Sequence, residues 1–334
     1  MQRILIIRFS SIGDIVLTTP VIRCIAEQVD DVEIHYLTKP GYSSLLEAHP
    51  QICKIHVLSE NWSEMIKTLK EQNFSFIVDL HNNLRSRRIT SRLGVKSSAF
   101  NKLNVKKWLA VNFKWDVLPK VHIVQRYLDA AEKLGVKNDG KGLDHFIPEN
   151  TANHLTELPE KFQQGYIALV IGAQHYTKKL PVTQLVDLSK KLTDNGHPVL
   201  LVGGPEDETI ANLLMAQVEG LESICGKSSI QESALMIQQA THVITHDTGM
   251  MHIAAALDKK IISVWGNTIP EFGMSPYYGD KHPLNEQRKN NWIIENKGLS
   301  CRPCSKIGYT HCPKGHFKCM MDLDMSNLAN QVNS

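Results

Sequence analysis

Residues Arg8–Pro20, with the sequence RFSSIGDIVLTTP, decide the fold class of this chain. They follow the apolar run Ile4–Ile7 and lead into apolar residues at helical spacing, so they predict a buried strand, a tight loop and a helix. A phosphate-binding loop in this position would carry several glycines or a lysine. This loop has a single glycine, Gly13, and places a carboxylate, Asp14, at the start of the helix.

Two interpretations of Asp14 follow from the residues alone. Ser11 and Asp14 fit a variant of the capping box, in which the serine hydroxyl accepts an amide of the first turn and the helix dipole favours the acid. That interpretation explains the carboxylate as a structural feature. The alternative is that the loop presents Asp14 for chemistry, and the stretch itself does not separate the two.

Length and composition exclude several classes of protein. A chain of 334 residues is too long for one ordinary core and predicts two domains. The net charge of +3 gives no global reason to expect nucleic-acid binding. No apolar run approaches the roughly 18 to 20 residues of a membrane span. The short N-terminal run lies between Arg3 and Arg8, so we expect neither a signal peptide nor an anchor, and place the protein in the cytoplasm.

Strand-like runs alternate with helical ones along the chain, which is the pattern of a parallel α/β sheet. The predicted strands are Ile4–Ile7, Val32–Tyr36, Lys54–Val57, Phe76–Asp79, Tyr166–Ile171, Pro198–Val202, His242–Thr245 and Ile261–Val264. A passage rich in glycine, proline and asparagine, from Asn138 to Asn150, separates the two sets. We predict two doubly wound, Rossmann-like domains, residues 1–150 and 151–334, with ligands in the cleft between them.

Positive charge is concentrated from Arg85 to Lys120, where ten lysines and arginines occur against one acid. Such a segment is either a solvated face or a site for an anionic acceptor or an anionic membrane surface. Trp108, Phe113 and Trp115 lie within it, which suits a surface that touches lipid headgroups or sugars.

A loop in the second half has the features of a phosphate site. His246–His252 joins a predicted strand to a helix, and Asp247, Thr248 and Gly249 stand at the helix start. Free amides and the positive end of the helix dipole favour a phosphate at such a position. An ordinary aspartate or threonine helix cap is the alternative.

Two further loops of this half follow predicted strands. Gly172–Pro181 contains Lys178, which could meet a diphosphate or could simply be solvated. Val202–Glu208 has a glycine turn followed by acids in the first turn of a helix, which could accept hydrogen bonds from ribose hydroxyls. Acids in a first turn are common, so this last signal is weak by itself.

Taken in order, these motifs resemble the ADP-heptose:lipopolysaccharide heptosyltransferases, glycosyltransferase family 9. The matching pieces are SSIGD, GA-x4-K-x-x-P, GGP-x-[DE] and D-T-G-x-x-H-x-A-A-A, and together they cover essentially the whole chain. The resemblance implies the GT-B fold, in which two Rossmann-like domains face a central cleft. It also implies inversion at the anomeric carbon without a catalytic metal or other cofactor.

The resemblance implies roles for individual residues. Asp14 matches the proposed general base, and Ser10, Ser11 and Gly13 match the loop that shapes it. Lys178 matches a lysine that contacts the donor phosphates. The implied donor-binding residues are Asp247, Thr248, Gly249, His252, Asp207 and, beside the adenine, Ser228.

The acceptor side is less well defined by the resemblance. We place Arg85, Arg87 and Arg88 there, in the half where family members differ most, and Leu180 stands where the family often has tryptophan. We expect an ADP-sugar donor, a lipopolysaccharide inner-core acceptor and peripheral contact with the inner membrane. The alternatives are a GT-B transferase with another donor or acceptor, an epimerase, or a non-catalytic nucleotide-sugar binding protein. An NAD oxidoreductase is disfavoured, because no G-x-G-x-x-G follows a predicted strand.

Four of the seven cysteines form the pattern C-x2-C-x7-C-x6-C near the C-terminus: Cys301, Cys304, Cys312 and Cys319. This spacing suits a tetrahedral structural zinc site, with His311 and His316 as spare ligands. Reduced thiols that stabilise a loop, or disulfides, are the alternatives. Similar tails occur in many members of the resembled family, and we predict no catalytic role for them.

Overall fold

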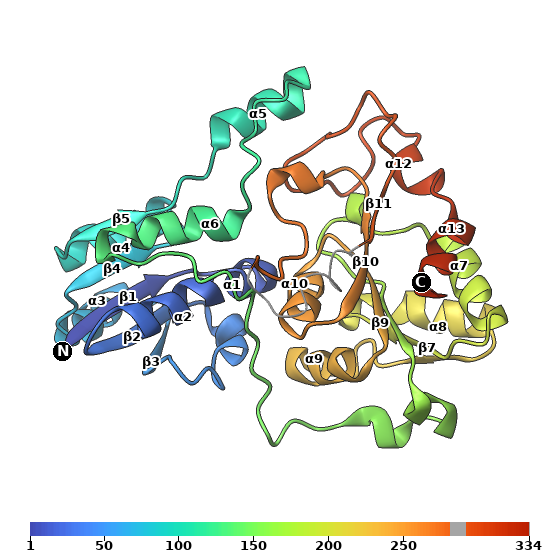
Figure 1. Cartoon of the computed structure of the whole chain (residues 1–334), viewed down its shortest axis with the longest axis horizontal. Helices are drawn as coiled ribbons and strands as arrows, with labels where there is room; N and C mark the ends of the chain where they lie inside the picture. The colour runs from blue at the N-terminus through green and yellow to red at the C-terminus, as the bar shows by residue number, and fades with distance from the viewer. Residues whose placement is uncertain (281–291, 334) are drawn as a thin grey trace. The chain divides into compact units, whose positions relative to one another are not determined.

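A computed structural model describes residues 1–280 and 292–333, which form two compact units (Figure 1). Unit 1 contains Met1–Leu103, Val121–Pro148 and residues 279–280. Unit 2 contains Asn104–Lys120, residues 149–278 and residues 292–333. The segment Asn104–Lys120 therefore groups with the second unit, although the chain returns to the first unit after it. The domain boundary at residue 150 stays a prediction.

Unit 1 is built on a parallel sheet. Its described strands are β1 (Gln2–Ile7), β2 (Val32–Thr38), β3 (Lys54–Val57), β4 (Phe76–Asp79) and β5 (Ser97–Ala99). Their order is β3-β2-β1-β4-β5, and every neighbouring pair is parallel. The winding direction reverses between β1 and β4, which is where doubly wound folds bind their ligands.

Helices flank this sheet, and they bury its central strand on both faces. They are α1 (Ile12–Val16), α2 (Thr19–Gln28), α3 (Trp62–Glu71), α4 (Leu84–Leu93) and α6 (Ile123–Leu128), with 3₁₀ turns at Pro40–Leu45 and Asp129–Leu134. Ile4, Leu5, Ile6 and Ile7 of β1 are all fully buried. Continuous burial of this kind is expected for a parallel strand covered on both sides.

Unit 2 has a second parallel sheet. Its described strands are β6 (Ile167–Val170), β7 (Val199–Val202), β8 (Leu221–Ser223), β9 (His242–His246), β10 (Lys260–Trp265) and β11 (Trp292–Glu295). Their order is β11-β10-β9-β6-β7-β8, with parallel pairing throughout. Read from β6 as the first strand, this is the 3-2-1-4-5-6 order of the Rossmann fold, with the switch between β6 and β9.

The helices of unit 2 lie before, between and after these strands in the sequence. They are α5 (Asn104–Phe113), α7 (Val182–Asp194), α8 (Glu208–Gln217), α9 (Ile230–Gln239), α10 (Gly249–Ala256), α12 (Lys318–Met321) and α13 (Met325–Asn330). The described residues of this unit also form 3₁₀ turns at His154–Glu157, Glu160–Gln164, Tyr176–Lys178, Pro205–Asp207, Pro270–Phe272 and Gln331–Asn333. Within the described residues, no helix is long and apolar enough to cross a bilayer.

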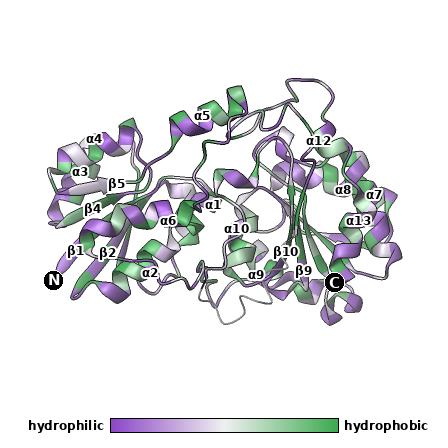
Figure 2. Cartoon of the chain, turned by 45° about the horizontal axis from the view of Figure 1, so that its top comes forward, coloured by the Kyte–Doolittle hydropathy of each residue, from purple (hydrophilic) through white to green (hydrophobic). Residues whose placement is uncertain are grey.

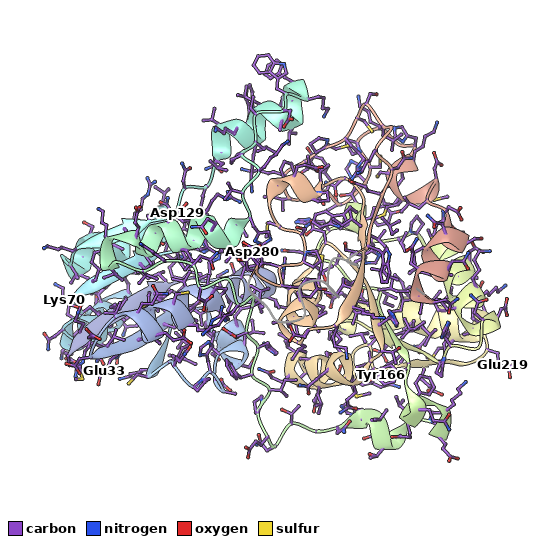
Figure 3. All side chains as sticks on the ribbon, viewed as in Figure 1. Glu33, Lys70, Asp129, Tyr166, Glu219 and Asp280 are labelled. Carbon is purple, nitrogen blue, oxygen red and sulfur yellow. The ribbon has the colours of Figure 1, made fainter. Side chains whose placement is uncertain are left out.

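Burial follows the hydropathy of the sequence. Figure 2 shows hydrophobic residues along the central strands and polar residues on the outer surfaces of helices such as α7. Tyr166, labelled in Figure 3, is buried just before β6, and its hydroxyl donates to the Met236 carbonyl of α9. The polar end of this large ring is therefore satisfied inside the core, as buried tyrosines require.

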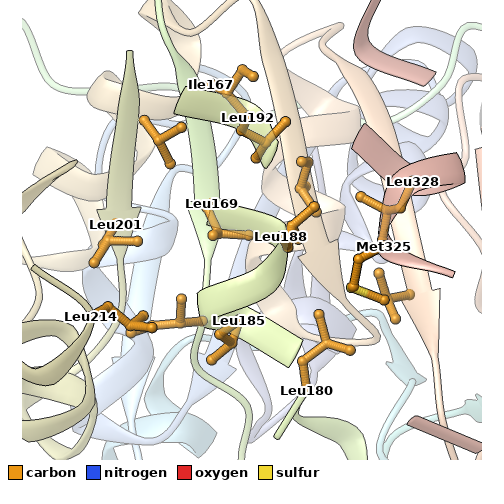
Figure 4. Close-up of a cluster of buried hydrophobic side chains, with 14 of the residues drawn as sticks. Ile167, Leu169, Leu180, Leu185, Leu188, Leu192, Leu201, Leu214, Met325 and Leu328 are labelled. Atoms are coloured by element: carbon orange, nitrogen blue, oxygen red, sulfur yellow. The ribbon is translucent and has the colours of Figure 1, made fainter. Parts of the chain in front are cut away.

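The core of unit 2 joins its sheet to the C-terminal end of the chain (Figure 4). Leu185, Leu188 and Leu192 of α7 pack in one cluster with Leu169 of β6 and Leu328 of α13. Complete burial of each such side chain stabilises the fold by about 1.5–3 kcal/mol. This packing fixes the C-terminal helices against the sheet of unit 2.

All eight predicted strands are present, and the α/β prediction is confirmed. The prediction missed β5, β8 and β11. The first two contain three residues each, and β5 has the sequence Ser-Ser-Ala, which carries no apolar run. Short edge strands of this kind are held by their neighbours, so their own residues need not show a strand pattern.

Candidate functional site

Asp14 lies at the switch point of unit 1, in the first turn of α1 directly after the loop that follows β1. Its Oδ2 atom is 2.7 Å from Nη2 of Arg8 and accepts the Ser11 hydroxyl at 2.9 Å. The Ser11 amide donates to the same oxygen at 3.4 Å. Tyr127 donates its hydroxyl to Oδ1 at 3.1 Å. The capping interaction and a set of long-range contacts therefore coexist at this carboxylate.

These partners keep Asp14 ionised. Burial raises the cost of the charge, but the Arg8 guanidinium and the hydrogen bonds from Ser11 and Tyr127 outweigh it, and the pKa of Asp14 lies below its usual value. Burial also opposes the Arg8 charge, yet the Asp14 carboxylate raises the pKa of Arg8. The carboxylate is consequently ionised throughout the physiological range of pH.

Arg8 also ties two loops together. Its Nε donates to the Ser10 carbonyl and its Nη1 to the Leu80 carbonyl, each at 2.7 Å. Leu80 directly follows β4, so one buried side chain joins the loops after both switch-point strands. The sequence prediction missed Arg8 and Tyr127. A charged residue directly after an apolar strand was a signal for Arg8, whereas Tyr127 is 113 positions from Asp14 and gave none.

The loop after β4 is organised by Asp79. Its Oδ1 accepts the amides of His81 and Asn82, and its Oδ2 accepts the Ser86 hydroxyl. Burial lowers the pKa of His81 to about 3, so its neutral ring can accept the Phe9 amide through Nδ1. The loop that leads to the arginines of α4 is thus fixed from within the sheet.

The three predicted acceptor-side arginines lie on α4 and are exposed. They differ in their partners. Arg87 donates to Oδ1 of Asn82 at 3.0 Å, and the Arg88 guanidinium lies over the Trp62 ring, 4.7 Å from its centroid. Arg88 therefore has a packing role, which leaves Arg85 and Arg87 better placed for an anionic ligand.

In unit 2, Lys178 and Asp247 meet at the switch point between β6 and β9. Lys178 ends the 3₁₀ turn after β6, and its Nζ is 2.6 Å from Oδ2 of Asp247 and 3.2 Å from the Asp247 carbonyl. The Thr268 hydroxyl donates to the same carboxylate oxygen at 2.8 Å. The structure therefore brings together two residues that are far apart in the sequence and that were both predicted for the donor site.

Thr248 is the N-cap residue of α10, and Gly249 is its first helical residue. In the structure as described, the Thr248 side chain makes no capping hydrogen bond to the helix, and its hydroxyl lies 3.5 Å from that of Thr245. The amides of the first turn are thus not capped by this side chain, which suits an anionic ligand at the positive end of the helix.

A neutral histidine connects the two loops of this site. His246 is buried at the end of β9, and burial lowers its pKa to about 4. Its Nε2 accepts the Leu180 amide at 2.9 Å, which anchors the lysine-containing loop to β9. Leu180, which replaces the expected tryptophan, is itself buried. His252 lies buried on α10.

Asp207 is 1% exposed and holds two loops together. Its Oδ1 is 2.6 Å from Nζ of Lys179, and its Oδ2 accepts the Gly204 amide. A Cβ atom at Gly172 would collide with this carboxylate, and one at Gly203 would come within 2.9 Å of it. Glycine is therefore required at both positions by close packing. Asp207 acts structurally in this arrangement, and its contact with a ribose stays a prediction.

Ser228 lies between β8 and α9, where its hydroxyl donates to the Ile224 carbonyl at 3.1 Å and meets the Ser233 hydroxyl at 2.8 Å. These contacts fix the turn before α9. The predicted position beside an adenine stays a prediction.

The cysteine-rich segment is fastened to unit 2 by Arg302. This buried side chain donates to the Gly266, Thr268 and Asn296 carbonyls and pairs with the Glu295 carboxylate at 2.9 Å. The sequence prediction missed it, because an arginine next to a cysteine gives no local signal of partners that lie 6 to 36 positions away. The segment is thus held by an arginine whose guanidinium donates hydrogen bonds to backbone carbonyls after β10 and β11.

The four cysteines themselves are free thiols in the structure. Sγ of Cys301 is 3.9 Å from Nε2 of His316, but among the described residues the cluster does not bring three ligand atoms within 4.8 Å of one another. A tetrahedral zinc site needs four converging ligands. The thiols as placed do not form one, and the structural zinc site stays a prediction.

Glu33, His35 and Cys53 of unit 1 do bring three ligand atoms within that distance. However, Glu33 is already paired with Arg3, its Oε2 atom lying 2.6 Å from the guanidinium Nε. The cluster lies toward the amino-terminal part of β2 and before β3, away from the switch point. It takes no part in the site.

Comparison with known proteins supports one family. The family model described as glycosyltransferase family 9 (heptosyltransferase) matches residues 62–309. Lipopolysaccharide heptosyltransferase 1 of Pseudomonas aeruginosa is 22% identical over 96% of this chain and 91% of its own length.

Two solved structures of proteins from Escherichia coli have the same fold as this chain. The ADP-heptose lps heptosyltransferase II has a TM-score of 0.71 and 18% identity, covering 100% of this chain and 98% of its own. The heptosyltransferase WaaC with ADP has a TM-score of 0.67 and 21% identity, with 99% and 98% covered. These matches confirm the predicted GT-B fold. The matched family range includes Lys178 and Asp247, whereas Asp14 lies before it.

Proposed function

Because the chain belongs to glycosyltransferase family 9, the heptosyltransferases, we propose that it transfers a heptose from ADP-heptose to a sugar of the lipopolysaccharide inner core. The names of its relatives support the acceptor class, and the solved neighbour with ADP supports the donor class. The observation that carries the chemistry is an ionised carboxylate, Asp14, held by Arg8 at the switch point of unit 1.

In the proposed reaction Asp14 acts as general base. An acceptor hydroxyl forms a bond to the anomeric carbon on the face opposite to the leaving group, so the configuration inverts. The bond from this carbon to the diphosphate oxygen breaks, its electron pair leaves with ADP, and the hydroxyl proton passes to Asp14. A base of low pKa suffices when proton removal lags behind departure of ADP from an oxocarbenium-like centre.

The leaving diphosphate needs positive charge, which Lys178 and the start of α10 supply. The Lys178 ammonium and the amides at Thr248 and Gly249 belong to neighbouring strand ends, β6 and β9. Asp247 positions Lys178 through their 2.6 Å ion pair. Preorganised donors of this kind stabilise charge that develops in the transition state. The proposal therefore uses no catalytic metal.

We also propose that Arg85 and Arg87 contact anionic groups of the acceptor, and that the enzyme works in the cytoplasm in peripheral contact with the inner membrane. Both arginines are exposed on α4, which begins directly after the loop organised by Asp79. Arginine suits phosphate and carboxylate groups because its donors form a planar fork.

ADP release is the test. The full chain is incubated with ADP-heptose, UDP-sugars or GDP-sugars, with and without extracted lipid A core, and the anomeric configuration of any product is determined by NMR. We expect release with ADP-heptose and acceptor, and an inverted product. Release with another donor would identify a different GT-B transferase, and binding without turnover would identify a non-catalytic binder. The same assay after chelation, together with metal analysis, tests the metal-independent mechanism and the structural zinc.

A further inference from the structure

Helix α5 exposes its apolar residues instead of burying them. Ala110 is its buried residue, whereas Val105, Trp108 and Phe113 are 71%, 54% and 51% exposed. Trp115, just beyond the helix, is 56% exposed. An ordinary surface helix of a globular protein shows the reverse arrangement, with its apolar stripe against the core.

The exposed aromatic side chains form one continuous cluster. The ring centroids of Trp108 and Phe113 are 5.4 Å apart, and those of Phe113 and Trp115 are 5.2 Å apart. Large apolar side chains scattered singly on a surface need no explanation, but a contiguous patch of them indicates an interaction site. Figure 2 shows hydrophobic and hydrophilic residues mixed along α5.

Basic residues surround this cluster. Residues 102–120 contain five lysines and a single acid, Asp116. Two of the lysines attach α5 to unit 2, since Lys114 donates to the Pro303 carbonyl and Lys107 lies over the Phe272 ring. Lys106 and Lys120 remain exposed. The helix is therefore attached to the rest of unit 2 near its start and just after its end, and it presents aromatic rings together with positive charge.

We propose that α5 and Trp115 form a membrane-docking surface, in which the aromatic cluster enters the headgroup region of an anionic bilayer. Tryptophan and phenylalanine favour this interfacial depth, and lysines beside them are attracted to the negative charge of anionic lipid. The occupant is a lipid surface because an aromatic patch with nearly uniform positive charge complements it. The choice of the inner membrane rests on the proposed function, since the acceptor would be anchored there.

Vesicle binding by the full chain tests this proposal. We would measure co-sedimentation with vesicles of phosphatidylethanolamine and phosphatidylglycerol, and with vesicles of phosphatidylcholine alone. The wild-type chain should bind the anionic vesicles. The double variant Trp108→Ala/Trp115→Ala should bind them about tenfold more weakly or worse. Lys106→Glu should weaken binding by about fivefold or more at low salt, and the effect should fade at high salt.

Matched controls exist in unit 2. Leu213→Ala removes an exposed apolar side chain from α8, and Lys190→Glu reverses an exposed charge on α7. Both should bind vesicles as the wild type does. A thermal melt checks that the α5 variants remain folded, which their exposure predicts.

Three results would overturn the proposal: no binding of the wild type to anionic vesicles, equal binding by the α5 variants, or a dimer that the aromatic variant converts to a monomer. The last would show that a second copy of the chain covers α5. Turnover on an acceptor stripped of its acyl chains separates this proposal from the proposed function. The α5 variants should retain that activity. Vesicle binding that depends on α5 would stand even if ADP-heptose proved not to be the donor.

Discussion

The guanidinium of Arg8 and the carboxylate of Asp14 form an ion pair at 2.7 Å, with side chains only 10% and 19% exposed. Arg8 directly follows the buried strand β1, Asp14 lies six positions further along the chain, and the same arginine donates to the Leu80 carbonyl after β4. The pair therefore fixes the charge state of Asp14 and the shape of its loop at once. A test of Asp14 as the general base must therefore measure the stability of the fold as well as the rate of turnover.

Replacement of Asp14 by asparagine separates the two interpretations of this residue. Asparagine can still accept a hydrogen bond from Ser11, but it leaves the Arg8 guanidinium without its counter-ion. We expect a stability loss of about 1–3 kcal/mol, the scale of a lost hydrogen bond to a charged group. If Asp14 is the base, kcat should fall by about 10²–10⁴. Thermal melts and single-turnover rates on Asp14→Asn measure the two effects separately.

The matched control for this variant is Glu64→Gln. Glu64 lies in the first turn of α3 in the same unit, where its carboxylate accepts the Asn61 side-chain amide at 2.7 Å. The substitution Glu64→Gln should change kcat by less than twofold. Activity of Asp14→Asn within about threefold of the wild type would remove the base assignment and leave Asp14 as a helix cap.

Replacement of Arg8 should shift the pH dependence of kcat. Burial raises the pKa of Asp14, and Arg8 is the strongest influence that lowers it. In Arg8→Met the burial of Asp14 would no longer be opposed by the guanidinium charge, so the pKa of Asp14 should rise. Because the base must be ionised, the acidic limb of the kcat profile should move to higher pH.

The stability consequence of this pair has a definite sign. The folded-state pKa of Asp14 is depressed, so the pair stabilises the fold above the unfolded pKa and loses this effect as pH falls through the folded one. Acid unfolding of the wild type should therefore include this loss, and Arg8→Met should lack it. An unmoved acidic limb in Arg8→Met would mean that a group other than Asp14 controls it.

The fold could be predicted because each central strand is an apolar run that can be recognised from its own residues. Ile4–Ile7 and the other central strands are apolar runs buried on both faces, and such runs are recognisable one at a time. The edge strands β5 and β8 were missed because neighbouring strands, not their own residues, hold them in place. The order of the strands then puts Asp14 and Lys178 at the switch points of their sheets.

The partners of the site residues could not be predicted in the same way. Tyr127 reaches Asp14 across 113 positions and Thr268 reaches Asp247 across 21, so neither contact leaves a periodic signal. Asp207 looked like a ligand for ribose, but the structure shows it packed against glycines and paired with Lys179. A carboxylate in a first turn has the same sequence pattern whether it is exposed or buried.

Thr248 provides a test of the donor site. Thr248→Val keeps the shape of the side chain but removes a hydroxyl at the start of α10. We expect ADP affinity to fall by about 1–3 kcal/mol, the scale of a hydrogen bond to a charged group. Calorimetric titration of ADP into the full chain measures it, with Thr209→Val on the exposed surface of α8 as the control. Unchanged affinity would place the diphosphate elsewhere.

The arginines of α4 predict a charge-dependent effect on the acceptor. Arg85→Glu/Arg87→Glu should raise KM for the lipid acceptor, most strongly at low ionic strength, while ADP affinity stays unchanged. Arg88 is left in place because it stacks on Trp62. Lys70→Glu is the control, since Lys70 is exposed near the end of α3 (Figure 3). Equal KM values for the variant and the wild type at low salt would show that these arginines are merely solvated.

Adjacent lysines in the loop after β6 should have different roles. Lys178 pairs with Asp247 beside the start of α10, whereas Lys179 pairs with Asp207, which is almost fully buried. Lys179→Met would strand a buried carboxylate, so we expect it to cost about 3–5 kcal/mol of stability. Its activity per folded molecule should remain near that of the wild type. Lys178→Met removes the positive charge proposed for the leaving diphosphate, so kcat should fall by about 10²–10³.

The comparison has to be made on folded protein. Asp247 is also largely buried, and although it keeps the Thr268 hydroxyl, Lys178→Met should lose some stability as well. Rates are therefore measured well below the melting temperature of each variant and divided by the folded fraction from circular dichroism. A fall in kcat confined to Lys178→Met supports its role at the diphosphate. Equal falls in both variants would mean that the two ion pairs only hold the loop in shape.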